Sequence, residues 1–475
     1  MRKWQNLAPP NDPNSWYDVD GVWPTPVGSY ETVDFLSGTN LTATGVGVSV
    51  VYYAFCAQTL SGTREYILAD DCLFEYSGGT LTDRSGGIAT WGLYPMMAQY
   101  GNITIMVNGV NAADTLSSSG GNFAVLSGAP KAEIVLVAAN AVLMFNTSTS
   151  SDGWAASDVG DYTNWTSGEA ATGRLIQTPG PITAAVPFGN DVIVFKADAI
   201  YRLRYVGGTV KWASEPIYRG VGVGVHPVNV NLCKYSCRAG SAGILFAGYH
   251  EILTGYVSSY YYYFDGVSAP RRVNPLTKIP IGRIEYNPQQ DTFAVVNSAA
   301  ATLGQTHFYC PTSDAWGYSS TPIPGAAAAT YMPVSGDFSA RGEKSTMPVF
   351  YATHTSNQVT RYAHGTPVGD IASSCYLQTA MAGSTDAKTL FSRLTPILRR
   401  RRDLGADSAA LVVTTFRELT DTSAQVTSSS ITESSTRKRF DFNYSDNFAR
   451  FKVTFTALDV EVDDYLIAQK PAGKE

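Results

Sequence analysis

The sequence has little charge and no sustained helical periodicity. Of its 475 residues only 16% are charged, whereas ordinary globular proteins carry about 25%. Apolar residues reach 44%, which excludes disordered, collagen-like and coiled-coil chains as overall descriptions. The missing charge is replaced by glycine, serine, threonine and 28 tyrosines, residues typical of strands and turns. The composition therefore predicts an all-β protein.

Long apolar runs are also missing. The longest, Ile134 to Phe145, spans 12 residues and contains Asn140, whereas a helix that crosses a bilayer needs about 20. The first ten residues, Met1 to Pro10, have a basic tip with no apolar stretch behind it, so we expect no signal peptide. We therefore expect synthesis in the cytoplasm and no membrane-spanning segment.

Cysteine and histidine are too few and too scattered to form a recognisable metal site. Cys233 and Cys237 lack the second ligand pair of a zinc site. The wide spacing of the cysteines predicts reduced, mostly buried thiols instead of a disulfide framework. We expect no metal and no cofactor. The residues concerned are Cys56, Cys72, Cys233, Cys237, Cys310, Cys375, His226, His250, His307, His354 and His364.

The charge balance argues against tight binding of nucleic acid. The net charge is −6. From Cys375 to the end there are 14 Lys or Arg and 13 Asp or Glu, against 20 and 27 before it. The first three-quarters of the chain is thus acidic, whereas proteins that grip phosphates are basic.

A hairpin recurs along the chain: an apolar run, a small or polar turn, and a second apolar run that ends in an aromatic residue. Seven copies have centres about 47 residues apart, near the roughly 40 to 50 of propeller blades. The spacing predicts a β-propeller of six or seven blades, with a pair of β-sandwiches as the alternative. The copies are Tyr66–Thr82, Ile103–Val125, Ile134–Trp154, Asp191–Trp212, Ile244–Val273, Phe293–Tyr318 and Val349–Thr366.

The pattern changes after about residue 375 to longer alternating runs, which predict strands with one buried face. We read the stretch from Asp386 to Thr395 as a strand as well, because Pro396 stops a helix there. The predicted organisation is an extended N-terminal arm (1–40), the propeller (41–374) and a C-terminal β-sandwich (375–475). The alternating runs are Leu411–Phe416, Phe440–Tyr444 and Phe451–Phe455.

Catalytic motifs are scarce. No Gly-x-Ser-x-Gly stands at a strand-to-helix turn, so we expect no enzyme. The stretch from Ser151 to Trp165 resembles the Ser-x-Asp-x-Gly-x-Thr-Trp turn of sialidase-like propellers, but it occurs once and out of frame. Such turns are structural, because the aspartate bonds to backbone amides and the tryptophan packs between blades. We single out Asp158, Gly160, Asp161 and Trp165 as a propeller turn.

Two further clusters have both a structural and a functional interpretation. The run Tyr260–Phe264 could stack on sugars or bases, but alternate residues of a strand face opposite ways, so we favour packing between blades. The arginines between Leu398 and Leu404 either lie in solvent or dock on carboxylates of a partner subunit. This candidate assembly interface comprises Arg399, Arg400, Arg401 and Arg402.

One region resembles a known family. The runs Trp154–Trp165, Thr178–Thr183, Phe188–Lys196 and Ile200–Tyr205 resemble, in the same order, the propeller of the tail nozzle, or packaged-DNA-stabilising, proteins of short-tailed bacteriophages. The close match covers about 70 residues, and the rest agrees only in length and in a propeller followed by a β-domain.

This resemblance implies a structural virion protein. It would form a hexameric ring below the portal and the head-to-tail adaptor protein, meet tail fibres or spikes, and conduct the packaged DNA during ejection without binding it tightly. An acidic or neutral wall suits that role, because it makes few phosphate contacts. The alternative is a carbohydrate-binding or glycoside-cleaving propeller. A WD-repeat scaffold is disfavoured, since no Gly-His or Trp-Asp signature repeats.

Overall fold

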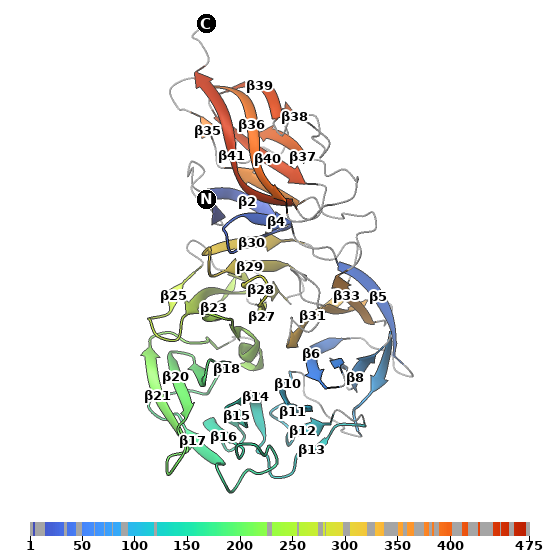
Figure 1. Ribbon diagram of the computed structural model, residues 1–475, viewed down its shortest axis with the longest axis vertical. Helices are drawn as coiled ribbons and strands as arrows, with labels where there is room; N and C mark the ends of the chain where they lie inside the picture. Colours follow the sequence, from blue (N-terminus) through green and yellow to red (C-terminus); the bar gives the residue numbers. More distant parts are fainter. Residues whose placement is uncertain are drawn as a thin grey trace.

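Two-residue turns between apolar runs produce the repeated hairpin of this protein. In β14–β15, Ala138 pairs with Ala141, and the turn residues Ala139 and Asn140 have φ values of 47° and 56°. Positive φ at both turn positions matches the twist of the flanking strands. In the computed structural model of the chain, such hairpins extend into four-stranded antiparallel sheets, and six of these sheets stand around a ring (Figure 1).

The structure describes residues 3–4, 15–32, 36–43, 50–60, 62–70, 72–77, 79–86, 94–117, 121–225, 230–253, 256–273, 279–280, 282–297, 305–320, 328–336, 350–354, 359–364, 375–379, 382–383, 389–400, 411–416, 426–427, 440–446, 448–455 and 460–471.

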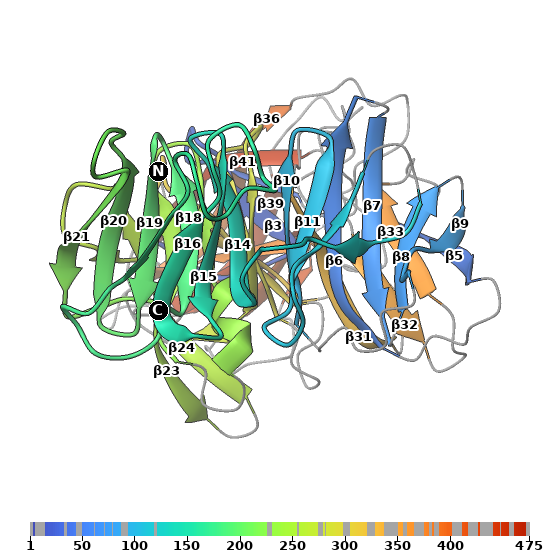
Figure 2. The same ribbon diagram turned by 90° about the horizontal axis from the view of Figure 1, so that it is seen from below.

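The protein is therefore an all-β, six-bladed propeller. Blade 1 consists of β6 (Val51–Thr59), β7 (Gly62–Ala69), β8 (Cys72–Ser77) and β9 (Thr80–Asp83). Blade 2 consists of β10 (Met96–Tyr100), β11 (Ile103–Val107), β12 (Asp114–Leu116) and β13 (Ala124–Val125). Blade 3 consists of β14 (Ala132–Ala138), β15 (Ala141–Thr147), β16 (Ser150–Ala156) and β17 (Ala171–Arg174). Figure 2 shows β14, β15 and β16 of blade 3 side by side.

Blades 4 to 6 continue around the ring. Blade 4 consists of β18 (Ala184–Phe188), β19 (Asp191–Lys196), β20 (Ala199–Tyr205) and β21 (Trp212–Arg219). Blade 5 consists of β22 (Cys237–Ala239), β23 (Ile244–Leu253), β24 (Tyr256–Phe264) and β25 (Arg271–Arg272), and β26 (Ile279–Pro280) also pairs with β24. Blade 6 consists of β27 (Gly282–Asn287), β28 (Thr292–Asn297), β29 (Thr306–Cys310) and β30 (Ala315–Ser319).

The core lies between the blades. One buried cluster fills each of the interfaces between blades 1 and 2, 2 and 3, 3 and 4, and 4 and 5. Phe145, Trp154 and Tyr201, for example, meet between blades 3 and 4. Blades 2, 3 and 4 thus bury both faces against neighbouring blades, as radial stacking requires.

The seventh predicted hairpin is not a blade. Within Val349–Thr366 lie β32 (Phe350–His354) and β33 (Val359–His364), which join β31 (Ala328–Gly336), β5 (Leu36–Ala43) and blade 1 in a closed barrel. β31 pairs in parallel with β6 and also contacts β27, so it stands at the seam between the last blade and the first.

The N-terminal segment, predicted as an extended arm, contains four strands that join the propeller to the C-terminal strands. They are β1 (Lys3–Trp4), β2 (Ser15–Asp20), β3 (Val22–Pro24) and β4 (Tyr30–Thr32). β1 and β3 pair with β30 of blade 6, whereas β2 pairs with β34 (Cys375–Thr379) and β4 with β41 (Val460–Pro471). Figure 1 shows β2 and β4 between blade 6 and the strands near the C-terminus.

The expected strands of the C-terminal region are present. The stretch read as a strand from Asp386 lies largely within β36 (Thr389–Arg400), which confirms that reading. The three alternating runs form β37 (Leu411–Phe416), β39 (Phe440–Asp446) and β40 (Phe448–Phe455). Two short strands complete this region, β35 (Ala382–Gly383) and β38 (Val426–Thr427). Among the described residues, no helix has the length and apolar character needed to cross a membrane.

Candidate functional site

The turn singled out in the sequence lies between β16 and β17, where its polar groups bond to the loop itself. The Asp158 carboxylate accepts hydrogen bonds from the Glu169 backbone N–H at 2.7 Å and from Asn164 Nδ2 at 3.2 Å. Asp161 Oδ1 accepts from the backbone N–H of Thr163 at 2.9 Å and from its hydroxyl at 2.6 Å. These bonds to the charged form lower the pKa of Asp161.

The other two turn residues fix this loop to the blades. Gly160 adopts a φ of 86°, which a glycine reaches without strain, and its N–H donates to the Asn140 carbonyl at 2.8 Å. Trp165 is 8% exposed and packs in the cluster between blades 2 and 3. The four residues therefore stabilise a loop, and none of their contacts forms a reaction centre.

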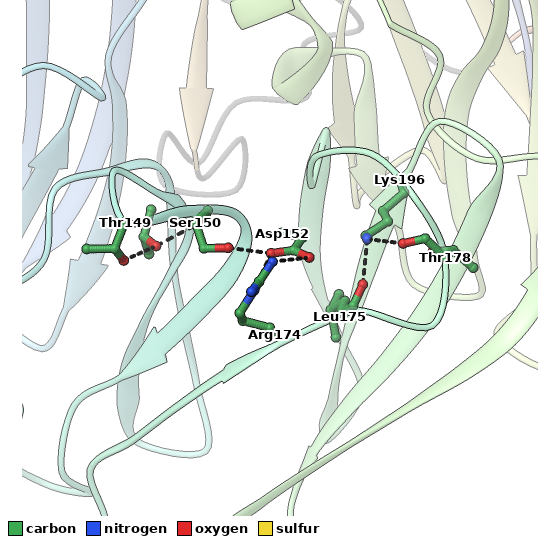
Figure 3. A network of polar contacts seen from close by, with 8 residues as sticks. Thr149, Ser150, Asp152, Arg174, Leu175, Thr178 and Lys196 are labelled. Carbon is green, nitrogen blue, oxygen red and sulfur yellow. Dashed lines mark hydrogen bonds and ion pairs between the residues drawn. The ribbon is translucent and has the colours of Figure 1, made fainter.

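A second polar network links blades 3 and 4 (Figure 3). Lys196, the last residue of β19, is buried at 1% exposure. Its ammonium donates to the backbone carbonyls of Leu175 at 2.5 Å and Thr178 at 2.7 Å. Burial lowers the pKa of Lys196, and the nearby Asp152 partly offsets this. Lys196 therefore anchors the loop that leads from blade 3 into blade 4.

Asp152 occupies the exposed side of the same network. Its Oδ1 accepts from Arg174 Nε at 2.8 Å and its Oδ2 from Arg174 Nη2 at 3.1 Å, and the Ser150 hydroxyl also donates to Oδ1. The bonds from Arg174 and Ser150 lower the pKa of Asp152 to about 2. A carboxylate held ionised in this way is a poor proton donor near neutral pH. No sequence motif pointed to this network, although Lys196 and Thr178 lie in the runs that carry the family resemblance.

Charged and aromatic side chains meet where the inner strands of the blades converge. The 3₁₀ helix η1 (Val230–Tyr235) is the coiled ribbon inside the ring in Figure 1, and it contacts β18, β22 and β27. Lys234 Nζ donates to the backbone carbonyl of Glu133 at 2.9 Å and to its Oε2 at 3.1 Å. Tyr235 donates its hydroxyl to the Pro95 carbonyl. We call this group, with Tyr53, Arg238, Arg283 and Glu285, the axial cluster.

Arg283 reaches the axial cluster from β27, the inner strand of blade 6. Its guanidinium lies over the Tyr235 ring at 3.9 Å and over the Tyr53 ring at 5.4 Å. Its Nη2 donates to the Tyr52 carbonyl at 2.7 Å. The cluster therefore links blades 1, 2, 3 and 6 through η1. Sequence reasoning had no signal for it, because its members are far apart in the chain.

The tyrosine run of β24 packs between blades, the reading favoured from the sequence. Tyr261 is fully buried in the apolar cluster that blade 5 shares with blade 6. Tyr262 stacks on Phe246 of the adjacent strand, with ring centroids 5.6 Å apart, and packs against the cluster between blades 4 and 5. The Tyr260 ring lies 3.6 Å from the Arg272 guanidinium. These contacts engage the rings of the run with side chains of the protein itself.

The candidate assembly interface lies in the C-terminal region. Arg399 and Arg400 end β36, where they pair in register with Glu461 and Val460 of β41. Arg401 and Arg402 lie outside the described residues. Two of the four arginines of the predicted interface therefore lie on β36, which pairs with β41.

Cysteine and histidine do not converge in the described part of the chain. Cys56, Cys233, Cys237 and Cys310 are buried, as the sequence predicted. No group of three His, Cys, Asp or Glu in the described ranges could hold a metal ion. His307 is buried, and this lowers its pKa to about 4, so the ring is neutral at physiological pH.

Comparison with known proteins shows a likeness of fold alone. No family model matches the sequence, and a search of curated proteins found no match. YCF48 bound to a D1 peptide is 10% identical over 70% of this chain and 97% of that one, with a TM-score of 0.40. The Pan2 WD40 domain of Neurospora crassa is 13% identical over 66% and 90%, with a TM-score of 0.41. The N-terminal domain of Nup159 is 9% identical over 76% and 99%, also at 0.41. Similarities this low carry no argument about function.

Proposed function

We propose that this chain is a structural virion protein, a subunit of the tail nozzle ring that closes and conducts the genome exit channel below the portal and adaptor. It has no catalytic role in this proposal and works through contacts with its neighbours. The resemblance of the blade 3 and blade 4 sequences to nozzle proteins motivates the assignment, and the geometry of the chain supports it in three ways.

The observation that carries the proposal is the continuous connection between propeller and C-terminal strands. One sheet runs from the C-terminal strands through β2, β1, β30, β3 and β4 and back to C-terminal strands. A single apolar cluster follows it, from Leu245 of blade 5 through Tyr30 to Phe391 and Phe451. A subunit built this way can transmit force between two contact surfaces without a hinge, because packed cores deform little.

The filled axis of the ring is the second support. Lys234 and Arg283 are each 4% exposed, and Tyr235 is 8% exposed. The central channel is the natural concavity of a propeller, and here side chains of the axial cluster occupy it. DNA would therefore pass between subunits and not through a propeller, and the acidic balance of the chain keeps phosphate contacts few.

The C-terminal strands are the third support. The Phe391 ring of β36 and the Phe451 ring of β40 meet at 5.7 Å, although these strands do not pair with each other. Such a contact suits two facing sheets, so we propose that this region is a small β-sandwich. It would meet the adaptor or a neighbouring subunit, with Arg399–Arg402 docking on carboxylates.

The composition of purified particles tests the proposal directly. We expect about six copies of this chain for each portal ring, because the resemblance to nozzle proteins implies a closed hexameric ring. Quantitative mass spectrometry of virus particles from the source measures this ratio. Absence of the chain from particles would remove the nozzle assignment. Glycan-binding and glycosidase assays would then test the carbohydrate-binding alternative, which no contact of the described residues favours.

Replacing the four arginines Arg399–Arg402 with alanine tests the assembly interface. We expect the variant to fold but to reach particles at less than about one-tenth of the wild-type level, because Arg side chains pair with carboxylates through two hydrogen bonds. The matched control replaces the basic run Arg437–Arg439 with alanine, and it should be incorporated normally. Normal incorporation of the first variant would show that these arginines are not the interface.

A further inference from the structure

The axial cluster contains one cation that has no anionic partner. Lys234 lies 3.1 Å from Glu133 Oε2, and Arg238 lies 3.7 Å from Glu285 Oε2. Arg283 is 4% exposed and makes no ion pair with any carboxylate among the described residues. Its Nη2 is satisfied by the Tyr52 carbonyl, but Nη1 is buried without a hydrogen-bond partner in the described part of the chain.

The axial cluster also holds the carboxylates of Glu133 and Glu285, but each lies beside another cation, Lys234 and Arg238 respectively. The charged groups of the cluster therefore sum to one excess positive charge. Lys234 Nζ lies 5.6 Å from the centre of the Tyr235 ring, on which the Arg283 guanidinium also lies at 3.9 Å. Burial lowers the pKa of Lys234 to about 8, and repulsion by Arg283 contributes, against the opposing effect of Glu133. The neighbouring strand β31 contacts β27 and contains no acidic residue.

A buried guanidinium of this kind calls for a counter-ion. Burying a charge is costly unless it is paired, and an unsatisfied buried polar group in a folded protein commonly marks an ion or water. A water would satisfy the Nη1 donor but would leave the charge unpaired. A small anion does both, because it accepts the hydrogen bond and compensates the charge.

We propose that the axial cluster binds a small monovalent anion of the size of chloride, held by Arg283 Nη1 with Lys234 nearby. The anion pins β27 to η1 and, through Lys234, to β14 of blade 3. The site is thus a structural ion site on the axis, independent of whether the chain belongs to a phage tail.

Thermal unfolding of the full chain tests the site, with chloride as the probe. Raising chloride from about 1 to about 100 mM, with gluconate holding the ionic strength constant, should raise Tm by about 3 °C, because an anion that binds only the folded state stabilises it. The Arg283→Lys variant keeps the charge but loses Nη1, so its Tm should not respond. The control Arg204→Gln alters an exposed arginine paired with Asp191 and should respond as the wild type does.

Bromide diffraction decides the question on the unmodified chain, should Arg283→Lys fail to fold. Crystals grown in bromide should show an anomalous peak within hydrogen-bond reach of Arg283 Nη1. A Tm that ignores chloride, together with no anomalous peak on the axis, would overturn the proposal. A peak only on the outer surface of the blades would identify an adventitious ion only, which also contradicts it.

Discussion

Replacing Arg361 with methionine is expected to lower the free energy of unfolding by about 3–5 kcal/mol, since it removes the bidentate cationic partner of a buried carboxylate. Arg361 of β33 donates from Nε to Glu65 Oε2 at 2.9 Å and from Nη2 to Oε1 at 2.8 Å. The side chains of Glu65 and Arg361 are 6% and 18% exposed. Because the two residues are 296 positions apart, their pairing holds the returning chain to blade 1 across the barrel. Urea denaturation of the full chain measures the loss.

Two further variants separate this buried pair from an ordinary surface pair. Arg174→Met removes a pair of the same bidentate type on the surface, where the arginine is 61% exposed, and it should cost much less. The double variant Glu65→Leu/Arg361→Met should recover much of the loss, because no uncompensated charge remains. Equal costs for Arg361→Met and Arg174→Met would contradict the argument.

The propeller was predictable because its signal is local. A hairpin such as β14–β15 can be predicted from consecutive residues, because it consists of two apolar runs around a turn that allows positive φ. The regular spacing of such hairpins then points to repeated sheets. The blade number was not predictable in the same way. The hairpin β32–β33 has the same local pattern as a blade, and only its pairing with β5 and β31 shows that it belongs to a barrel.

The same difference between local and long-range contacts decides which functional residues could be predicted from the sequence. The turn at Asp158 and Asp161 could be proposed from sequence, since most of its hydrogen bonds join residues within about ten positions of one another. The axial cluster could not, because Lys234 and Glu133 are 101 positions apart and Arg283 and Tyr52 are 231 positions apart. The sequence around Arg283 contains no pattern that predicts a contact with blade 1. Such sites emerge only when the ring closes and brings the inner strands together.

Replacing Asp114 with asparagine is expected to stabilise the protein at pH 8 and to leave its stability nearly unchanged at pH 4. Asp114 of β12 is 2% exposed, and its Oδ1 has no hydrogen-bond partner among the described residues. Burial raises its pKa from 3.8 to about 6. Between these two values the unfolded chain releases the proton while the folded chain keeps it, so stability falls as the pH rises through this window. The full penalty of about 3 kcal/mol is present above pH 6, and Asp114→Asn removes it.

The variant Asp161→Asn serves as the control, because its effect on stability at pH 8 should have the opposite sign to that of Asp114→Asn. Asp161 is exposed, and its bonds to Thr163 lower its pKa. Its contribution to stability is therefore present above the unfolded pKa and is lost as the pH falls, so Asp161→Asn should destabilise the protein at pH 8. Each variant is compared with the wild type at the same pH, which cancels the contribution of His307, whose pKa is lowered to about 4. If Asp114→Asn were destabilising at pH 8, the carboxylate would have to be held by a favourable contact, and burial would not be the dominant influence on it.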